Sequence, residues 1–370
     1  MNDEIDNHLP SVTTHFNVHG NFLSGEPYGS GHINDTYCVR YNQAGTPVRY
    51  ILQRINHAVF RQVPELMANI SRVLAHQHAA LAAGPDDASR RAMTLVPTRD
   101  GVTFLEAADG TYWRLYLFVE GARTHDTIEH AAMAEAAAAA FGRFQHRMAS
   151  LPAPRLHETI PAFHDTPDRY RKLEVAAAAD TAGRAAGVAR ELAFARARAD
   201  EAGRLTRMLA AGELPERVTH NDTKLNNVML DDRTGEGICV IDLDTVMPGL
   251  ALYDFGDMVR SACNSAAEDT PDSGAVQFRL PLFEALARGY LGTAREFLTP
   301  AEMGQLAFAG RLMTLECGVR FLTDYLAGDT YFRCHRPNQN LDRCRVQFAL
   351  MAEMERAARD MQAIIARYAS

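Results

Sequence analysis

The chain has 370 residues and a mass of 40.9 kDa, more than one hydrophobic core usually spans, so we expect two lobes. Its 38 Lys and Arg against 46 Asp and Glu leave a net charge of −8. That balance argues against a nucleic-acid-binding protein with a general basic surface, because such proteins must neutralise phosphates. No apolar run reaches the roughly 20 residues that span a bilayer, and the acidic Met1–Glu4 is unlike a secretory signal. We therefore expect a cytoplasmic protein with no membrane partner.

The six cysteines are scattered and form no CxxC pair, which is typical of reduced, buried thiols. Zinc sites need closely spaced Cys and His ligands. The nearest approach is His76 and His78, in a stretch that we expect to be a solvated helix face. The sequence thus predicts no structural metal.

The first 120 residues predict a small antiparallel sheet that carries one helix. Short β-type runs at 36–41 and 50–55 flank a turn at 42–47, and residues 63–81 have helical periodicity. A second hairpin is predicted from 94–98 and 103–106, followed by a strand over 111–119. The fold class indicated is α+β.

From residue 128 onward the pattern is mainly helical. Apolar residues from Val188 to Leu209 form one long stripe, which predicts a helix packed on a core. The helical run breaks at Leu214-Pro215, and a β-type segment follows. We place the boundary after residue 119, giving an N-terminal lobe of 1–119 and a C-terminal lobe of 120–370.

Polar residues that could carry out chemistry are most concentrated in the segment from His220 to Asn227 and in the Asp242-Leu243-Asp244 run. The runs 227–230 and 238–243 flank a turn and predict a hairpin. Strand alternation would put Asp242 and Asp244 on one face. Together with Asn227 they offer the oxygen ligands that Mg²⁺ accepts beside substrate phosphates.

Asp222 is then a carboxylate near that metal, able to accept the proton of a hydroxyl that attacks a γ-phosphate. Lys224 could neutralise the phosphoryl oxygens, and we expect His220 to brace the loop. The competing interpretation is an ordinary Asn/Asp turn before a hairpin. The spacing HxDxxxxN followed by IDxD favours a kinase catalytic loop and its metal-binding Asp.

These motifs resemble the aminoglycoside phosphotransferase/choline kinase superfamily, and within it the N-acetylhexosamine 1-kinases. The broad part of the resemblance is carried by residues 220–227, 241–249 and 253–257. The narrower part is carried by Gly31-His32-Ile33-Asn34-Asp35-Thr36-Tyr37, by residues 315–326 and by Asp329-Thr330-Tyr331-Phe332. The resemblance covers nearly the whole chain.

The resemblance implies a protein-kinase-like bilobal fold, with nucleotide bound by the N-terminal lobe and catalysis and acceptor binding in the C-terminal lobe. It implies ATP with Mg²⁺ and transfer to the anomeric hydroxyl of a neutral sugar, N-acetylglucosamine or N-acetylgalactosamine. Asp222 corresponds to the catalytic base, and Asn227 and Asp242 to the Mg²⁺ ligands. Arg320 and Tyr331 correspond to acceptor contacts. An alternative for Arg320 is a surface ion pair with Asp324.

Two departures from the kinase pattern stand out. In place of a Gly-rich loop the chain has Gly29-Ser30-Gly31 and the polar Asn34-Asp35-Thr36, whose backbone amides could cradle phosphate. The third-strand lysine is absent from Ile51-Leu52-Gln53-Arg54. Arg54 is the candidate phosphate anchor, with Glu65 as partner, although Gln53 could face the nucleotide instead.

Phe118 and Val119 end a strand where the lobes should join, and backbone groups there would bind adenine. Asp254 and Asp257 are expected to brace the catalytic loop rather than react.

Three other functions compete. A kinase of this fold could act on choline, homoserine, methylthioribose or an aminoglycoside, although a cationic acceptor favours an acidic or aromatic pocket. Asp242-Leu243-Asp244 could be the DxD site of a glycosyltransferase, but residues 1–120 do not show the expected βαβ series. A catalytically dead binding protein is disfavoured by the intact Asp222 and Asn227. The sequence determines neither the preference between N-acetylglucosamine and N-acetylgalactosamine nor the oligomeric state.

Overall fold

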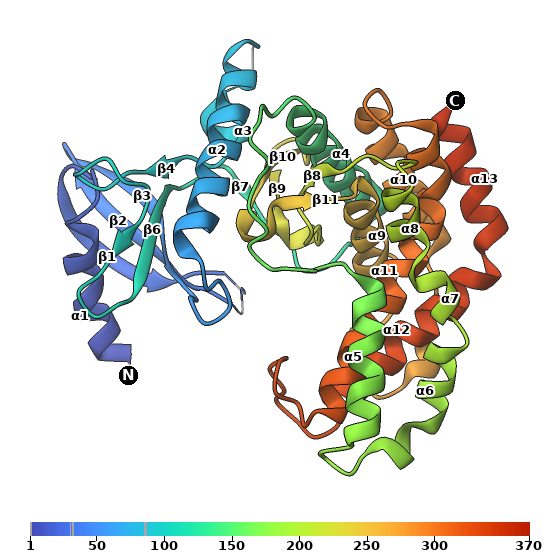
Figure 1. Ribbon diagram of the computed structural model, residues 1–370. Helices are drawn as coiled ribbons and strands as arrows, with labels where there is room; N and C mark the ends of the chain where they lie inside the picture. The colour runs from blue at the N-terminus through green and yellow to red at the C-terminus, as the bar shows by residue number, and fades with distance from the viewer. Residues whose placement is uncertain (1, 30, 32, 85–86) are drawn as a thin grey trace. The chain divides into compact units, whose positions relative to one another are not determined.

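A computed structural model describes residues 2–29, 31, 33–84 and 87–370, and it divides the chain into two compact units (Figure 1). The first unit comprises the chain up to Ala122 together with Leu151–Ile160 and Ile238–Met247. The second comprises Arg123–Ser150, Pro161–Gly237 and Pro248–Ser370. The single boundary predicted after residue 119 assigned neither later segment to the first unit. Ser30 and His32, quoted above in two motifs, lie outside the described residues.

The first unit is built on an antiparallel sheet with the order β1-β2-β3-β6-β4, to which β5 adds on β6. Its elements are α1 (Asn2–Thr13), β1 (Asn21–Pro27), β2 (Asp35–Gln43), β3 (Thr46–Ile55), α2 (Val63–Ala82), α3 (Ala88–Arg91), β4 (Leu95–Val96), β5 (Leu105–Glu106) and β6 (Tyr112–Leu117). The predicted antiparallel sheet and its helix are confirmed. α1 and β1 were not predicted, since Pro10 interrupts the helical pattern of one and β1 lacks a continuous β-type run.

The hairpin predicted from 94–98 and 103–106 is wrong in its pairing. Leu95 pairs with Tyr116 and Leu105 pairs with Trp113, so both short strands use β6. They lie end to end along the edge of β6 that β3 leaves open, where each finds backbone partners.

The two faces of the sheet differ in character. Leu52 and Leu115 belong to an apolar cluster with Leu9 and Val12 of α1. Strand alternation sends the neighbouring Gln53 and Arg114 to the opposite face. Arg114 Nη1 there lies 4.0 Å from the sulfur of Met67 on α2. One face is therefore dry and apolar, and the other carries buried polar groups.

The second unit is mainly helical, which confirms the predicted class of small sheet and larger helical part. Its elements are α4 (Ala131–Met148), α5 (Thr166–Ala179), η1 (Ala185–Val188), α6 (Ala189–Arg196), α7 (Ala199–Ala202), α8 (Arg204–Ala210), β8 (Arg217–Thr219), η2 (Leu225–Asn227), β9 (Val228–Asp231), α9 (Ala251–Ala262), η4 (Ser273–Ala275), α10 (Leu280–Ala294), α11 (Pro300–Leu326), α12 (Gln339–Arg356) and α13 (Ala358–Ala369). β7 (Ala122–Arg123), β10 (Gly237–Val240) and β11 (Met247–Gly249) lie where the chain passes from one unit to the other, and η3 (Leu243–Thr245) belongs to the first unit.

α11 organises this unit. It packs against α5, α9, α12 and α13, and Figure 1 shows it running through the middle of the helical part. A capping box begins it, with Thr299 accepting from the Glu302 N–H and Glu302 accepting from the Thr299 N–H. Arg217, the first residue of β8, donates to the Glu302 carboxylate at 2.8 Å. The start of the helix is thus fixed to the strand that precedes the His220–Asn227 segment.

The stripe from Val188 to Leu209 predicted one long helix, and this is wrong. The segment forms η1 and three short helices, α6 to α8, broken at Arg198 and Gly203 where φ and ψ leave helical values. Burial of the stripe is nevertheless confirmed, since Val188, Leu192 and Leu205 are buried. Periodicity found the apolar face but not the breaks, because tertiary contacts such as Arg198 with Glu355 end the helix.

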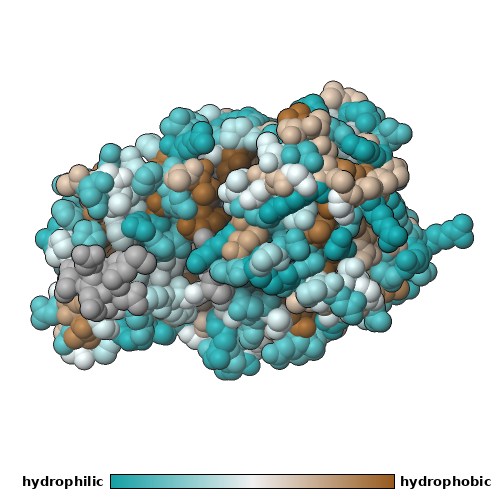
Figure 2. Space-filling view, turned by 90° about the horizontal axis from the view of Figure 1, so that it is seen from below, coloured by the Kyte–Doolittle hydropathy of each residue, from teal (hydrophilic) through white to brown (hydrophobic). Residues whose placement is uncertain are grey.

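None of the described helices is long and apolar enough to cross a membrane. Figure 2 shows that hydrophilic residues cover most of the face drawn, with hydrophobic residues exposed in a few groups.

Close packing of α10 on α4 generates a stability prediction. A Cβ placed on the buried Gly289 would lie 2.2 Å from the backbone oxygen of Glu135, so Gly289→Ala must push the two helices apart. We expect a loss of about 1–3 kcal/mol in the free energy of unfolding, measured by urea denaturation. Gly292→Ala, on the same helix with nothing within 4 Å of its Cβ, is the matched control. It should be neutral or stabilising by up to about 1 kcal/mol, and equal losses in both variants would contradict the packing argument.

Candidate active site

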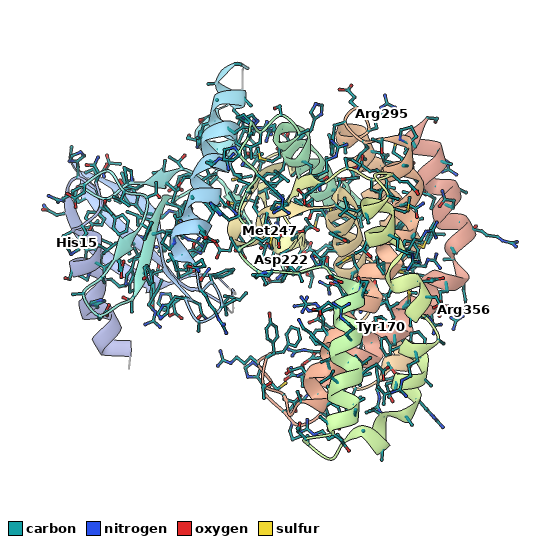
Figure 3. The ribbon with its side chains drawn as sticks, in the orientation of Figure 1. His15, Tyr170, Asp222, Met247, Arg295 and Arg356 are labelled. Carbon is teal, nitrogen blue, oxygen red and sulfur yellow. The ribbon has the colours of Figure 1, made fainter. Side chains whose placement is uncertain are left out.

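The segment between β8 and η2 carries the predicted catalytic residues, and Figure 3 labels Asp222 within it. His220, Asn221 and Thr223 are buried, whereas the Asp222 side chain is partly exposed. A loop with buried backbone must find partners for its N–H and C=O groups.

Asp254 on α9 supplies most of those partners. Its carboxylate accepts from the His220 N–H at 2.9 Å, from the Asn221 N–H at 2.6 Å and from Gln145 Nε2 at 2.6 Å. Burial raises the pKa of the Asp254 carboxyl above its ordinary value, although the nearby His220 and these hydrogen bonds oppose the rise. Tyr290 in turn donates to the Gln145 oxygen.

Asp257, one turn further along α9, binds the backbone of the loop at Thr223. It accepts from the Thr223 N–H at 2.9 Å and from Arg260 Nε at 2.8 Å. Burial would raise the pKa of Asp257, but the Arg260 guanidinium holds it below its usual range. The prediction that Asp254 and Asp257 brace the loop is confirmed.

Asn221 has a left-handed backbone, with φ of 66°, which asparagine tolerates better than most residues. Its carbonyl lies 3.1 Å from His164 Nε2, and His164 Nδ1 lies 2.8 Å from Glu316 on α11. Burial by itself raises the pKa of Glu316, but His164, the Thr166 hydroxyl and Arg320 together hold it below its ordinary value. The turn that aims Asp222 is thus tied to α11.

His220 braces the loop, as predicted. Its ring packs edge-on against Phe141 and Phe144, with centroids 5.4 and 6.0 Å away. The Asp222 N–H lies 3.3 Å from His220 Nδ1. The imidazole therefore fills an apolar site and orients the neighbouring backbone.

Asp222 is held by two neighbours. Asn227 Nδ2 donates to the Asp222 carbonyl at 2.7 Å and to Oδ2 at 3.1 Å, and Lys224 Nζ lies 3.1 Å from the same Oδ2. Because the nitrogen end of the Asn227 amide faces Asp222, its oxygen end points away from these groups. That oxygen is the end a metal ion would use.

A second polar cluster lies on α11 and the loop after it. Arg320 sits between the rings of Phe163 and Phe332, at 5.4 and 5.5 Å from their centroids. Among the described residues its guanidinium makes no hydrogen bond or ion pair, so the pairing with Asp324 considered above is not formed. Tyr331 is 64% exposed.

Asp324 instead shapes the loop that carries Tyr331. Its carboxylate accepts from the backbone N–H groups of Thr330, Tyr331 and Phe332 at 2.8–2.9 Å. Asn340 Nδ2 donates to it at 2.8 Å. This buried acid places Tyr331 and Phe332 relative to Arg320.

In the first unit, Phe118 and Val119 follow β6 and are buried. The Phe118 ring is covered by the Arg49 guanidinium at 3.8 Å, and Tyr28 meets it edge-on at 5.6 Å. The Phe118 N–H donates to the Arg49 carbonyl at 3.2 Å.

Arg54 lies on the face of β3 opposite to Gln53. It forms an ion pair with Asp35, and about half of each side chain is exposed. Glu65 is not its partner, since the Glu65 carboxylate lies 3.9 Å from His157 Nδ1. Gln53 donates to Thr36 Oγ1 at 3.0 Å and accepts from Arg114, so the polar face of the sheet belongs to Gln53.

The placement of Asp242 and Asp244 on one strand is also wrong. β10 ends at Val240, Asp242 has a left-handed backbone with φ of 58°, and η3 then carries Asp244. Asp242 is exposed. Asp244 is buried, and its carboxylate is bound by Arg114 and Asn34. These contacts argue against Asp244 as a metal ligand and against a DxD site.

Sequence reasoning missed several residues that shape these sites. Glu316 and Asn34 lie inside motifs that were quoted, so their polar character was a usable signal. Arg114 gave a weaker sequence signal, because it is a charged residue between Trp113 and Leu115 in an apolar strand. Nothing in the sequence marked Gln145 or His164, because their partners are far away along the chain.

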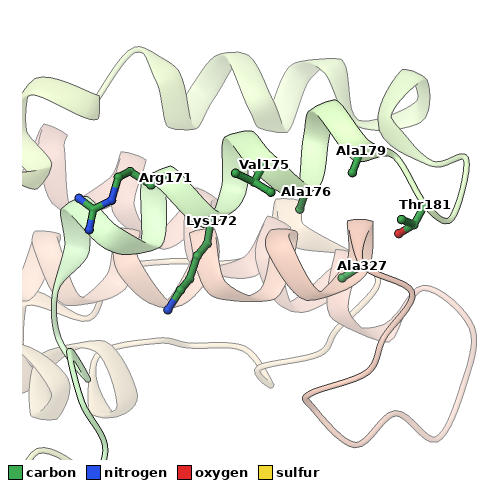
Figure 4. A pocket seen from close by; sticks show the side chains of 7 residues that line it. All are labelled: Arg171, Lys172, Val175, Ala176, Ala179, Thr181 and Ala327. Atoms are coloured by element: carbon green, nitrogen blue, oxygen red, sulfur yellow. The ribbon is translucent and has the colours of Figure 1, made fainter.

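A separate depression lies beside α5, lined by Arg171, Lys172, Val175, Ala176, Ala179, Thr181 and Ala327 (Figure 4). Three of its seven lining residues are alanine, and no carboxylate belongs to it. It therefore lacks a general base.

Solved structures with similar folds are kinases of small molecules. A microcompartment-associated aminopropanol kinase has a TM-score of 0.58 and 19% identity, covering 96% of this chain and 98% of its own. An aminoglycoside phosphotransferase from Alicyclobacillus acidocaldarius has 0.60 and 13%, covering 96% of each chain. An amicoumacin kinase, solved with AMP-PNP and Ca²⁺, has 0.54 and 12%, covering 97% of this chain and 96% of its own. These likenesses show a kinase-like fold.

The amino-acid sequence itself matches a protein-family model. Residues 24–297 match the model named APH, the phosphotransferase enzyme family. This stretch includes the loop around Asp222, Asp242 and the two bracing acids of α9. The chain belongs to the phosphotransferase enzyme family.

Proposed function

We propose that the protein is an ATP-dependent kinase that phosphorylates the anomeric hydroxyl of an N-acetylhexosamine, N-acetylglucosamine or N-acetylgalactosamine. The observation that supports this acceptor is the lack of hydrogen-bond acceptors around the Arg320 guanidinium among the described residues. The guanidinium is held between two phenyl rings. Five N–H donors in that setting call for a ligand rich in oxygen, and a sugar with an acetamido carbonyl would supply it.

Asp222 is the proposed general base. Asn227 and Lys224 fix its carboxylate, so it can accept the proton of the sugar hydroxyl as that oxygen attacks the γ-phosphorus. Lys224 would also offset the negative charge of the transferring phosphoryl group. Phe118 and Val119 would line the adenine site with their backbone.

Asn227 and Asp242 would hold Mg²⁺. Both offer hard oxygen ligands: Asp242 is exposed, and the nitrogen end of the Asn227 amide is the end taken up by Asp222. Bound Mg²⁺ would neutralise charge on the β- and γ-phosphates. Asp244 drops out of this set because Arg114 and Asn34 occupy its carboxylate.

Amino-alcohol acceptors are the second candidate, since the aminopropanol kinase shares the fold. The charges around Arg320 disfavour them. Burial and the charge of Arg320 lower the pKa of Arg169, which indicates two guanidinium groups near each other. Glu316, an acid whose pKa Arg320 also lowers, is already bound by His164 and Thr166. A cationic acceptor would meet two guanidinium groups there.

An acceptor panel tests the proposal. The protein is incubated with ATP, Mg²⁺ and either N-acetylhexosamines, neutral hexoses, choline, homoserine, methylthioribose or an aminoglycoside. ADP release is followed, and ³¹P NMR identifies the product. We expect a phosphomonoester on the anomeric carbon of an N-acetylhexosamine. Turnover with amino alcohols alone would refute the acceptor assignment.

Asp222→Asn should lower kcat by about 10²- to 10⁴-fold, because the amide cannot take the hydroxyl proton. ATP affinity, measured by isothermal titration calorimetry, should change little. Asp200→Asn, at an exposed position of α7, is the control and should retain full activity. A loss of ATP binding in Asp222→Asn would instead make Asp222 a metal ligand.

Arg320→Ala should raise the KM for the sugar by about 10- to 100-fold, the range expected for lost hydrogen bonds from a charged donor. The KM for ATP should stay constant. Arg311→Ala removes an arginine from the same helix, one that lies over Phe308, and should leave both constants unchanged. An unaltered sugar KM in Arg320→Ala would remove Arg320 from the acceptor site.

A further inference from the structure

Arg114 is a charged residue in the interior of the sheet. Its side chain is 1% exposed, and both terminal nitrogens donate to the Asp244 carboxylate, Nη2 to Oδ2 at 3.0 Å. Its Nε donates to Gln53 Oε1 at 2.9 Å, and Gln53 is its direct cross-strand partner on β3. A guanidinium removed from water is tolerated only with such complete pairing.

Asp244 is held from two further segments of the first unit. Asn34 Nδ2 donates to its Oδ2 at 2.6 Å, and the Thr159 hydroxyl donates to its backbone carbonyl at 3.2 Å. Asn34 is itself fixed, because its side-chain oxygen accepts from the Asn56 N–H at 3.0 Å. The position of Asp244 is therefore set by the sheet, by the turn before β2 and by residues 151–160.

Asp242 stands two residues before this anchor and has φ and ψ of 58° and 62°. A residue other than glycine keeps a left-handed backbone only where surrounding contacts determine it. The turn η3 follows at once, with Leu243 buried and the Val246 N–H donating to the Leu243 carbonyl at 3.1 Å. The contacts on Asp244 are side-chain interactions that tie this turn to the sheet.

We infer that Arg114 is a positioning residue for the metal-binding carboxylate of Asp242 and acts through Asp244. This inference rests on the proposed function, which makes Asp242 a ligand of Mg²⁺. Where the kinase pattern has a lysine on the third strand, this chain has the neutral Gln53. The positive charge on this face of the sheet belongs instead to Arg114, on the neighbouring strand β6.

The charge of Arg114 is secure. Burial by itself would lower its pKa, but the Asp244 carboxylate more than offsets this effect, and Asp242 adds to it in the same direction. Asp242 is therefore close enough to sense the guanidinium, while Asp244 takes its hydrogen bonds. By binding Asp244, the guanidinium fixes the turn that carries the Asp242 backbone.

Calorimetric titration of ATP into Arg114→Met, with and without Mg²⁺ and with no sugar present, tests this role. We expect the gain in ATP affinity that Mg²⁺ provides to fall by about tenfold or more, the usual effect of removing a group that orients a metal ligand. ATP affinity without Mg²⁺ should be unchanged. Arg40→Met, which breaks the exposed pair of Arg40 with Glu26 in the same sheet, is the control and should alter neither affinity.

Two further variants keep the test decisive if Arg114→Met does not fold. Arg114→Met/Asp244→Leu replaces the buried pair with apolar groups, which proteins often tolerate, and Asn34→Ala removes only one contact to Asp244. Both should fold and lose Mg²⁺-dependent affinity, the second to a smaller extent. Normal Mg²⁺ dependence in the folded double variant would overturn the inference.

A loss of ATP affinity that is equal with and without Mg²⁺ would also overturn it, because Arg114 would then bind phosphate directly. Failure of the proposed function gives a different result. If the sugar assignment is wrong, the acceptor panel fails while these titrations are unaffected. If the unaltered protein shows no Mg²⁺-dependent binding of ATP, both the function and the inference fall.

Discussion

The buried carboxylate of Asp254 is the constraint on which the second unit depends. It collects two backbone N–H groups of the catalytic segment and the Gln145 amide at 2.6–2.9 Å, so the loop can lie in the core while Asp222 stays accessible. Removing one partner of a buried, hydrogen-bonded charge typically costs about 3–5 kcal/mol. The geometry of the proposed base is thus maintained by a group that touches no substrate.

In the first unit, a buried ion pair holds the corresponding turn in place. Arg114 and Asp244 are both buried, and Asn34, Gln53 and Thr36 complete their hydrogen bonds. The contacts explain why the narrow motif around Asn34 and the acid at Asp244 occur in one chain. In each unit the carboxylate proposed to act, Asp222 or Asp242, is therefore beside a left-handed residue or on one, and buried polar groups stabilise that turn.

Much of this could be read from the sequence, and the omissions have physical causes. Strand alternation and helical periodicity located β2, β3, β6 and α2, because local sequence decides which face is apolar. The spacing from His220 to Asn227 predicted the catalytic segment, and the bracing contacts of Asp254 and Asp257 are confirmed. The strand placement of Asp242 and Asp244 failed because a left-handed residue ends the strand, and that depends on contacts with Arg114, about 130 residues away. The sequence could not show that Gln53 shares its face with Arg114, because that pairing depends on the sheet register.

α11 has a consequence for how the protein could change over evolution. Its 27 residues extend for about 40 Å and join Glu302, beside β8, to Glu316 and Arg320, with Asp324 one turn further. The strand before the predicted catalytic segment and the proposed acceptor residue Arg320 are therefore both tied to one helix. Tyr331 and Phe332 lie on the loop after that helix, where Asp324 accepts from their backbone N–H groups. If Arg320 and Tyr331 contact the acceptor as proposed, substitutions in that loop would alter acceptor preference and leave the contacts of Asp254 with the catalytic segment in place. The acceptor could then change while the residues proposed for phosphoryl transfer stay the same.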